Sequence, residues 1–207
     1  LLAISSGANV NFQRLSFIVE RSELGENREK ILSIEIPEKP GSFLKLSKLF
    51  GKSLITEFNY RKADKVKAHV LVGIRTKSDK NFISIKNNLK KNKFKFKDLT
   101  SNQISNDHLR HMVGGRIKSH NPDSIERIFR AEFPERPGAL LSFLESFGSN
   151  WNISLFHYRN LGSSYGSVLM GIEDNSKNKN TLLKHLNKIG LSIHEETSNP
   201  AYKDFLK

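Results

Sequence analysis

The chain contains no cysteine among its 207 residues. A disulfide framework, a zinc site with cysteine ligands, a thiolate nucleophile and a redox pair of cysteines are therefore excluded. Secretion is less favoured for the same reason. No apolar run approaches the roughly 20 residues that a bilayer-spanning helix needs, and residues 1–10 lack the charged start of a signal peptide. We therefore expect a soluble, cytoplasmic chain with no membrane partner.

Acidic side chains are scarce relative to basic ones, and the imbalance is local. The chain has 34 lysines and arginines against 21 acidic residues, a formal net charge of +13. Residues 28–100 carry 19 basic and 7 acidic side chains, a net charge of +12, whereas residues 121–207 carry 10 of each. A basic excess raises nucleic acid, an anionic membrane or an acidic partner as hypotheses.

The strongest signal in the sequence is an internal repeat. Three blocks recur in the same order at an offset of 97 or 98 residues: 35–44 as 132–141, 58–61 as 156–159, and 70–74 as 168–172. Each copy carries the step Glu-Lys/Arg-Pro-Gly, then an aromatic block ending in Tyr-Arg, then an apolar run ending in Gly-Ile. We interpret the chain as two copies of one unit of about 70 residues.

Within each copy the hydrophobic period predicts a strand, a helix, two strands, a helix and a strand. The expected ranges are 31–36, 43–50, 54–60, 66–75, 81–91 and 94–99, and then 128–133, 140–147, 153–159, 167–173, 182–189 and 191–195. The order βαββαβ, found twice, predicts an α+β protein of two ferredoxin-like units, each an antiparallel sheet with two helices on one face. The polar stretch 101–123 reads as the connection.

The Pro-Gly step at Gly41 and Gly138 ends a strand and opens directly into a helix. Such a turn leaves the first backbone N–H groups of the helix free to bind a carboxylate, and glycine allows its close approach. The alternative is a purely structural turn. Because the Pro-Gly turn occurs twice in ferredoxin-like units, we favour ligand binding over a purely structural role.

The densest basic run, on a predicted helix and the strand after it, consists of Lys86, Lys90, Lys91, Lys93, Lys95 and Lys97. RNA-recognition modules share the βαββαβ order, but aromatic side chains on their central strands stack on the bases. The strand at 67–73 has no aromatic residue, and its equivalent in the second copy offers only Tyr165. We therefore expect a solvated lysine face and no nucleic-acid partner.

Other motifs carry little weight. Residues 162–166 match the hydrolase pattern G-x-S-x-G with Ser164 as nucleophile, but they lie between two predicted strands, where a hairpin turn is expected. His108 and His111 could share a helical face, but no further ligand completes a metal site, so no metal is expected. No dinucleotide or Walker loop is present, so the sequence gives no support for nucleotide binding.

Nine segments, which together span essentially the whole chain, closely resemble biosynthetic threonine dehydratase, also called threonine deaminase or threonine ammonia-lyase. They are residues 6–12, 20–26, 40–44, 56–61, 112–116, 133–135, 137–141, 151–159 and 199–201. The resemblance implies a tetrameric pyridoxal-phosphate enzyme that converts threonine to 2-oxobutanoate and ammonia in isoleucine biosynthesis. A fold-type II catalytic domain is followed in that family by two ACT-like regulatory units.

The resemblance also implies the organisation of this chain. Residues 1–27 correspond to the end of the catalytic domain and the connection out of it, 28–100 to the first ACT-like unit, 101–123 to the linker and 124–207 to the second unit. The Schiff-base lysine and the phosphate-binding glycine loop have no counterpart here. Ser6, which matches the family serine beside the pyridine nitrogen, is the one cofactor contact implied. The parent is therefore expected to be the enzyme, and this segment alone inactive.

For regulation, the resemblance implies isoleucine and valine as effectors, isoleucine favouring an inactive arrangement and valine an active one. The implied effector residues are Tyr60, Tyr158, Leu140, Leu144, Phe147, Gly41, Gly138, Arg116 and Arg159. Leu140, Leu144 and Phe147 equally fit a stripe of core residues. Arg116 and Arg159, together with Arg61, could hold a carboxylate, join domains or form exposed ion pairs. A free-standing ACT-like module and a basic nucleic-acid binder remain as alternatives, the former opposed by the remnant at 6–12.

Overall fold

The computed structural model describes residues 15, 18, 22, 28–62, 66–76, 78–102, 104–105, 125–159, 165–174 and 180–206. Unit 1 consists of β1 (Glu29–Pro37), α2 (Ser42–Phe50), β2 (Leu54–Arg61), β3 (Lys67–Arg75), α3 (Asp79–Lys91) and β4 (Lys95–Asp98). Unit 2 consists of β5 (Ile125–Pro134), α5 (Ala139–Phe147), β6 (Asn152–Arg159), β7 (Tyr165–Asp174), α6 (Asn180–Lys188) and β8 (Ile193–Glu195). The expected βαββαβ order, twice, is confirmed.

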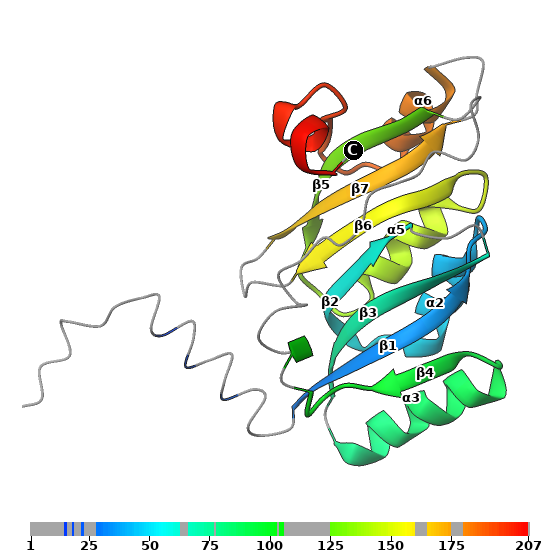
Figure 1. The fold of residues 1–207 in the computed structure, drawn as a ribbon, viewed down its shortest axis with the longest axis vertical. Helices are drawn as coiled ribbons and strands as arrows, with labels where there is room; N and C mark the ends of the chain where they lie inside the picture. The colour runs from blue at the N-terminus through cyan, green and yellow to red at the C-terminus, as the bar shows by residue number, and fades with distance from the viewer. Residues whose placement is uncertain are drawn as a thin grey trace, which may run out of the picture.

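The two units share one sheet of eight strands in the order β4-β1-β3-β2-β6-β7-β5-β8 (Figure 1). Every pair of neighbouring strands is antiparallel, including β2 and β6, which join the units. Phe58 lies opposite Tyr158, and Tyr60 lies opposite Phe156. Because Phe58 and Phe156, like Tyr60 and Tyr158, are equivalent positions of the repeat, the junction has an approximate local twofold axis.

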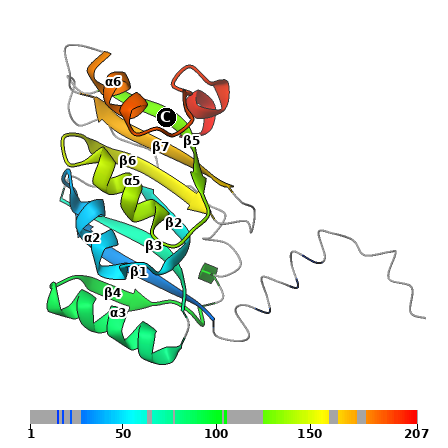
Figure 2. The ribbon, with the colours of Figure 1, turned by 180° about the vertical axis from the view of Figure 1, so that it is seen from behind.

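The helices cover one face of this sheet, with α2 and α5 beside each other at its middle and α3 and α6 toward its ends (Figure 2). Their apolar sides pack on the inward-facing residues of the strands. Phe43 of α2 packs on Phe58 and Phe156 of the joining strands, and Phe143 of α5 packs on Phe156, with ring centroids 5.5–6.4 Å apart. Aromatic pairs at such separations stabilise a core beyond their buried area, so a single core extends across both units.

Each unit has a register shift at the same place, next to a glycine. In unit 1 it lies between Ile55 and Glu57, opposite Gly73, and in unit 2 between Ile153 and Leu155, opposite Gly171. A β-carbon added to Gly73 would lie 2.5 Å from Thr56 Oγ1, and one added to Gly171 would lie 2.7 Å from Ser154 Oγ. The glycine in each repeated Gly-Ile step therefore makes room for the bulge.

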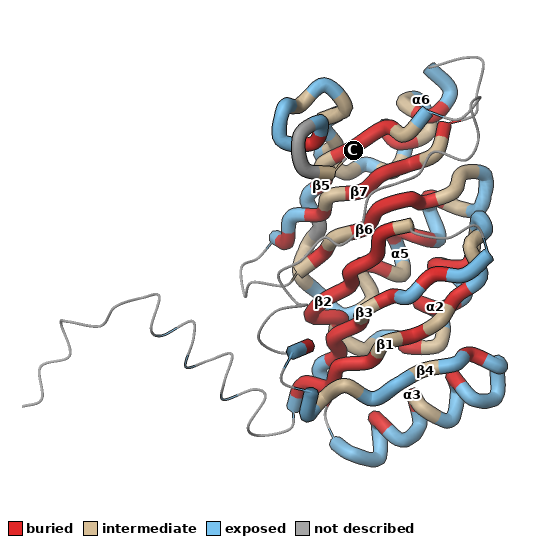
Figure 3. Tube along the Cα trace, viewed as in Figure 1, coloured by how far each residue is buried: buried red, intermediate tan, exposed pale blue. Residues whose placement is uncertain are grey.

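The strands β1, β5 and β7 extend beyond their expected ranges, because polar ends such as Glu29 and Lys30 take part in the ladder. Figure 3 shows the buried residues concentrated in the central strands, while β4 and the outer side of α3 are exposed. A short π-helix, η2 (Tyr202–Leu206), follows β8 and was not expected from the sequence. None of the described helices is long and apolar enough to cross a membrane.

Candidate functional site

Each unit places a Pro-Gly turn between its first strand and its first helix. Gly41 has φ 82° and Gly138 has φ 83°, a left-handed conformation that glycine adopts without steric penalty. In both turns the residue after the glycine donates its N–H to the carbonyl three residues earlier, at 3.2 and 3.1 Å. No side chain caps either helix. Both helix N-termini can therefore interact with an anion.

Each turn also lies against the other unit. A β-carbon added to Gly41 would lie 3.1 Å from Ser149 Cβ, just beyond the end of α5. The turn at Gly138 lies across a small cavity from the end of α2, and we call this space the junction cavity. Unit 2 lines it with Arg136, Gly138, Ala139, Leu140, Leu141 and Tyr158, and unit 1 with Ser47, Phe50, Gly51, Ser53 and Ile55. Its free volume of about 10 Å³ accommodates roughly one water molecule.

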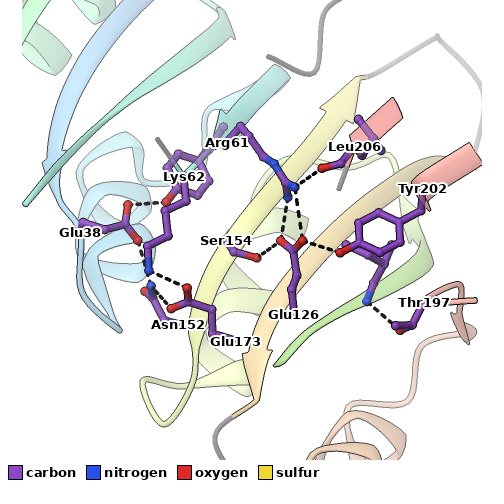
Figure 4. A network of polar contacts seen from close by, with 12 residues as sticks. Glu38, Arg61, Lys62, Glu126, Asn152, Ser154, Glu173, Thr197, Tyr202 and Leu206 are labelled. Atoms are coloured by element: carbon purple, nitrogen blue, oxygen red, sulfur yellow. Dashed lines mark hydrogen bonds and ion pairs between the residues drawn. The ribbon is translucent and has the colours of Figure 1, made fainter. Parts of the chain in front are cut away.

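A polar cluster that contains Glu38, Asn152 and Glu173 crosses the junction (Figure 4), and Tyr60 belongs to it through its hydrogen bond to Glu38. The Tyr60 hydroxyl donates this bond, and the Asn152 amide of unit 2 donates to the other oxygen of Glu38 at 2.9 Å. The same amide donates to Glu173 at 3.0 Å, and Lys62 Nζ lies 2.5 Å from Glu173 Oε1. Removal from water raises the pKa of the Glu38 carboxyl, and the two donors offset this only in part. Burial and the neighbouring Glu38 also raise the pKa of the Tyr60 phenol.

Tyr158 has an equivalent neighbour in unit 2. A β-carbon added to Gly166 would lie 2.8 Å from Glu135 Oε1 and 2.8 Å from Tyr158 Cε2, so the carboxylate and the ring flank one point. Glu38 and Glu135 are equivalent positions of the repeat. Each unit thus brings one tyrosine and one glutamate together beneath its Pro-Gly turn.

The helical stripe of α5 lies in the core. Leu140, Leu144 and Phe147 are 5%, 1% and 1% exposed, and all three belong to the main hydrophobic cluster. The Phe147 ring stacks on Phe143 with centroids 5.8 Å apart. Leu140 also lines the junction cavity, whereas Leu144 and Phe147 do not. Of the three, Leu140 is the one placed to contact a molecule in that cavity.

Arg61 forms a buried ion pair between the units. Its guanidinium donates to both carboxylate oxygens of Glu126, at 2.7 and 3.3 Å, and to the carbonyl of Leu206. Glu126 also accepts hydrogen bonds from Ser154 and from the Tyr202 hydroxyl, the latter at 2.7 Å (Figure 4). Desolvation and this bond to Glu126 raise the pKa of Tyr202. Arg61 therefore joins β2 to unit 2 and to the C-terminal helix η2.

The remaining expected site residues fall into two groups. Arg159 lies at the end of β6, opposite Glu57 in the β2–β6 ladder. Ser6 and Arg116, like His108 and His111, lie outside the described residues. Within the part of the chain that the structure describes, no cluster of three histidine, aspartate or glutamate side chains could hold a metal ion.

Sequence reasoning missed four polar residues of the junction: Glu38, Asn152, Glu126 and Tyr202. For Glu38 a signal existed, since the repeated Pro-Glu-Lys/Arg-Pro-Gly step carries a glutamate in both copies. The other three are brought together only by the pairing of the two units, which no local pattern indicates.

Comparison with known proteins places the chain among regulatory domains. The family model described as the C-terminal regulatory domain of threonine dehydratase matches residues 20–109 and again 117–206. The biosynthetic L-threonine dehydratases of Escherichia coli and Burkholderia multivorans are 46% and 45% identical to it over the whole chain. The mitochondrial threonine dehydratase of Saccharomyces cerevisiae is 38% identical over 99% of it.

The chain spans 40% of the length of the two bacterial relatives and 36% of the yeast one. Among solved structures, a putative glycine cleavage system transcriptional repressor aligns over 81% of this chain and 95% of its own. Its TM-score is 0.32 and its sequence identity 11%, which is too low to bear on function.

Proposed function

Because this chain belongs to the family of C-terminal regulatory domains of threonine dehydratase, we propose that it regulates a pyridoxal-phosphate enzyme that converts threonine to 2-oxobutanoate and ammonia. Isoleucine and valine are its effectors, and the parent is a homotetramer in the cytoplasm. The regulatory units act on a catalytic domain in the same parent chain. The relatives are longer than this chain, which supports a parent enzyme over a free-standing module.

The observation that carries the proposal is the pair of equivalent turns at the junction of the units. Each turn combines an uncapped helix N-terminus with a tyrosine and a glutamate of its own unit, and each lies against the other unit. These groups match the parts of an aliphatic amino acid. The helix N-terminus suits the carboxylate, the glutamate suits the ammonium group, and Leu140 with its apolar neighbours suits the side chain.

The size of the junction cavity links effector binding to regulation. A free volume of about 10 Å³ is far below the roughly 300–1,000 Å³ of ligand pockets. An amino acid can enter only if the end of α2 and the turn at Gly138 move apart. Since these elements belong to different units, binding changes how the units pack.

Regulation then follows as a population shift. Isoleucine binds more tightly to the inactive arrangement of the units and valine to the active one. Each effector moves the equilibrium only by its difference in affinity for the two arrangements, typically about 1–3 kcal/mol. The turn at Gly41, with Glu38 and Tyr60, offers a second site of the same design.

We infer that the parent protein holds its cofactor outside the residues described here. Pyridoxal phosphate needs a lysine that can form a Schiff base and a loop that binds phosphate. Among the described lysines, Lys30 is the one that is buried, and its ammonium is 3.3 Å from Asp79 and 5.5 Å from the centre of the Phe82 ring. It is engaged in an ion pair. We therefore assign cofactor binding and threonine chemistry to the rest of the parent protein.

The proposal is tested by assaying threonine turnover of the intact parent enzyme while isoleucine, and then valine, is added. We expect isoleucine to lower turnover at a fixed threonine concentration and valine to reverse this effect. Unchanged turnover at millimolar isoleucine would contradict the regulatory role.

A further inference from the structure

Unit 1 contains a second and larger cavity beside its own Pro-Gly turn, lined at the start of α2, whereas the junction cavity is lined at the end of α2. This second cavity has a volume of about 550 Å³ and lies where β1 ends, α2 begins and α3 ends. Five lysines line it, namely Lys39, Lys45, Lys67, Lys93 and Lys95, and Glu35 is the one acidic side chain among its described lining residues. We call this space the lysine pocket.

Glu35 neutralises little of this charge. Its Oε1 is 2.9 Å from Lys67 Nζ, so one lysine is paired within the pocket. Lys45 lies over the Phe94 ring, 5.8 Å from its centre, which orients the ammonium without neutralising it. A positive charge therefore remains on the exposed lysines that surround a cavity of ligand-binding size.

Ser42 supplies an independent sign of a missing partner. It is 5% exposed and lines the lysine pocket at the first residue of α2. Its buried Oγ has no hydrogen-bond partner among the described residues. A buried hydroxyl without a partner costs free energy, so an acceptor bound at this place would satisfy it. The uncapped N-terminus of α2 favours an acceptor that is negatively charged.

We propose that the lysine pocket binds a small phosphate-bearing molecule, held by the lysines, Ser42 Oγ and the N-terminus of α2. Lysine binds phosphate as a compact point charge, and several lysines around one cavity match an anion with more than one negative charge. A zwitterionic aliphatic amino acid does not need this charge. The site therefore adds a second ligand class to the effector sites at the junction.

Unit 2 provides a natural comparison, because the same turn there lacks the charge. The equivalent cavity has a volume of about 160 Å³ and is lined by Pro134, Arg136, Ala139, Ser142, Phe143, Ser146, Ile189 and Leu191. Arg136 is its one basic side chain among the described lining residues. The positions equivalent to Lys45, Lys93 and Lys95 are Ser142, Gly190 and Ser192. The lysine pocket is thus a property of unit 1 and not of the shared turn.

Lys93 strengthens this contrast. Its φ is 61°, the one left-handed residue other than glycine among the described residues. The equivalent position in unit 2 is Gly190, with φ 76°, where the conformation carries no steric penalty. Unit 1 therefore keeps a lysine beside the pocket at a position whose backbone favours glycine.

A small molecule fits the pocket better than RNA does. The space is bounded by β1, by the start of α2 and by the end of α3, so it is a concave site and not an open track for a strand. Its one aromatic lining residue, Phe94, is 9% exposed and offers no ring face on which a base could stack.

The test is calorimetric titration of the intact parent protein with inorganic pyrophosphate at constant ionic strength. The pocket variant is Lys93→Gly/Lys95→Ser, which installs the residues of unit 2. The matched control, Lys90→Gln/Lys91→Gln, removes the same charge from exposed residues outside the pocket. We expect binding that weakens about tenfold in the pocket variant and less than about twofold in the control.

A second variant, Ser42→Ala, keeps every charge and removes the buried hydroxyl. We expect it to weaken pyrophosphate about threefold to tenfold, the effect of one hydrogen bond to an anion. Isoleucine binding at the junction cavity should be unchanged in all of these variants, because none of the substituted residues lines that cavity, and this separates the lysine pocket from it. No binding at roughly 1 mM pyrophosphate, equal weakening in the control, or tighter binding of a single-stranded RNA that both double variants weaken equally would each overturn the proposal.

Discussion

Units 1 and 2 share a strand order, a Pro-Gly turn, a bulge beside a glycine and a tyrosine next to a glutamate, yet they differ strongly in charge. Residues 28–100 have a net charge of +12, whereas residues 121–207 are neutral. The cavities beside the two turns measure about 550 and 160 Å³. The features that the units share lie at or near their junction, whereas the charge and the volume that differ belong to the cavities beside the two Pro-Gly turns. A function common to both units therefore belongs to the junction.

The largest effect on stability is expected from Arg61 of unit 1, which pairs with Glu126 of unit 2. The Arg61 side chain is 2% exposed, and its removal leaves the charge of Glu126, whose side chain is 11% exposed, without its partner. We expect Arg61→Ala to lower the free energy of unfolding by about 3–5 kcal/mol. The control is Arg130→Ala, since the Arg130 side chain is 43% exposed and its pair with Glu196 contributes less than about 1 kcal/mol. Equal losses in urea unfolding would show that Arg61 does not hold the units together.

The bulge glycines test whether the units are equivalent. Gly73→Ala and Gly171→Ala each place a methyl group within 2.7 Å of a side-chain oxygen on the neighbouring strand. We expect each substitution to destabilise the protein by about 1–3 kcal/mol, and by similar amounts, because both overpack the same site. Chemical denaturation of the two variants measures this. A loss in one unit only would break the equivalence of the bulges.

The left-handed residues test where the units differ. Lys93→Gly removes a side chain from a backbone that disfavours it, and we expect a gain of about 0.5–1 kcal/mol in stability. The reverse change at the equivalent position, Gly190→Lys, should cost a similar amount. The thermal unfolding midpoints of the two variants provide the measurement. A loss on Lys93→Gly would mean that Lys93 makes a stabilising contact that outweighs its backbone strain.

The smallest expected effect concerns pH. Burial raises the folded-state pKa of Glu38 above its ordinary value of 4.5, so Glu38 binds its proton more tightly in the folded protein. Its contribution to stability is present below pH 4.5 and is lost as the pH rises through the folded-state pKa. A hydrogen bond from Arg127 lowers the pKa of Glu195, whose contribution is instead lost as the pH falls below 4.5.

The opposite pH dependences of the two contributions are checked by measuring the free energy of unfolding at a series of pH values. Glu38→Gln should remove the decline in stability above pH 4.5, and Glu195→Gln should remove the rise toward pH 4.5 from below. If Glu38→Gln leaves the slope above pH 4.5 as it was, the carboxylate is not desolvated at the junction.

The internal repeat made most of the fold predictable. In both copies the spacing of hydrophobic residues changes between strand-like and helix-like in the same order, which leaves few alternative folds. The buried polar residues of β2 were not predictable. Glu57, Asn59 and Arg61 alternate with apolar residues, a pattern typical of a strand with one solvated face, yet they are 1%, 7% and 8% exposed. Asn59 donates to Glu57 at 2.5 Å, and Arg61 pairs with Glu126, which lies 65 residues away. Such pairing depends on the second unit.

The candidate site was predictable in part for the same reason. Gly41, Gly138, Tyr60 and Tyr158 stand out because they occur at equivalent positions of both copies. Their neighbours across the junction, such as Ser53 and Asn152, do not stand out in the sequence. They come close to the site only through the antiparallel pairing of β2 with β6, which no local pattern indicates. The sequence indicates the residues that each unit contributes, and the shared sheet determines what they meet.

The claim that the junction binds the effector is tested most directly by filling the junction cavity. Ser53 lines this cavity, and its exposed neighbour Lys52 does not. Isoleucine is titrated calorimetrically into the intact parent protein as Ser53→Phe, with Lys52→Phe as the matched control. We predict at least about a tenfold loss of isoleucine affinity in Ser53→Phe, close to 1.4 kcal/mol, and no change in the control. Unchanged isoleucine binding in a folded Ser53→Phe protein would contradict the account.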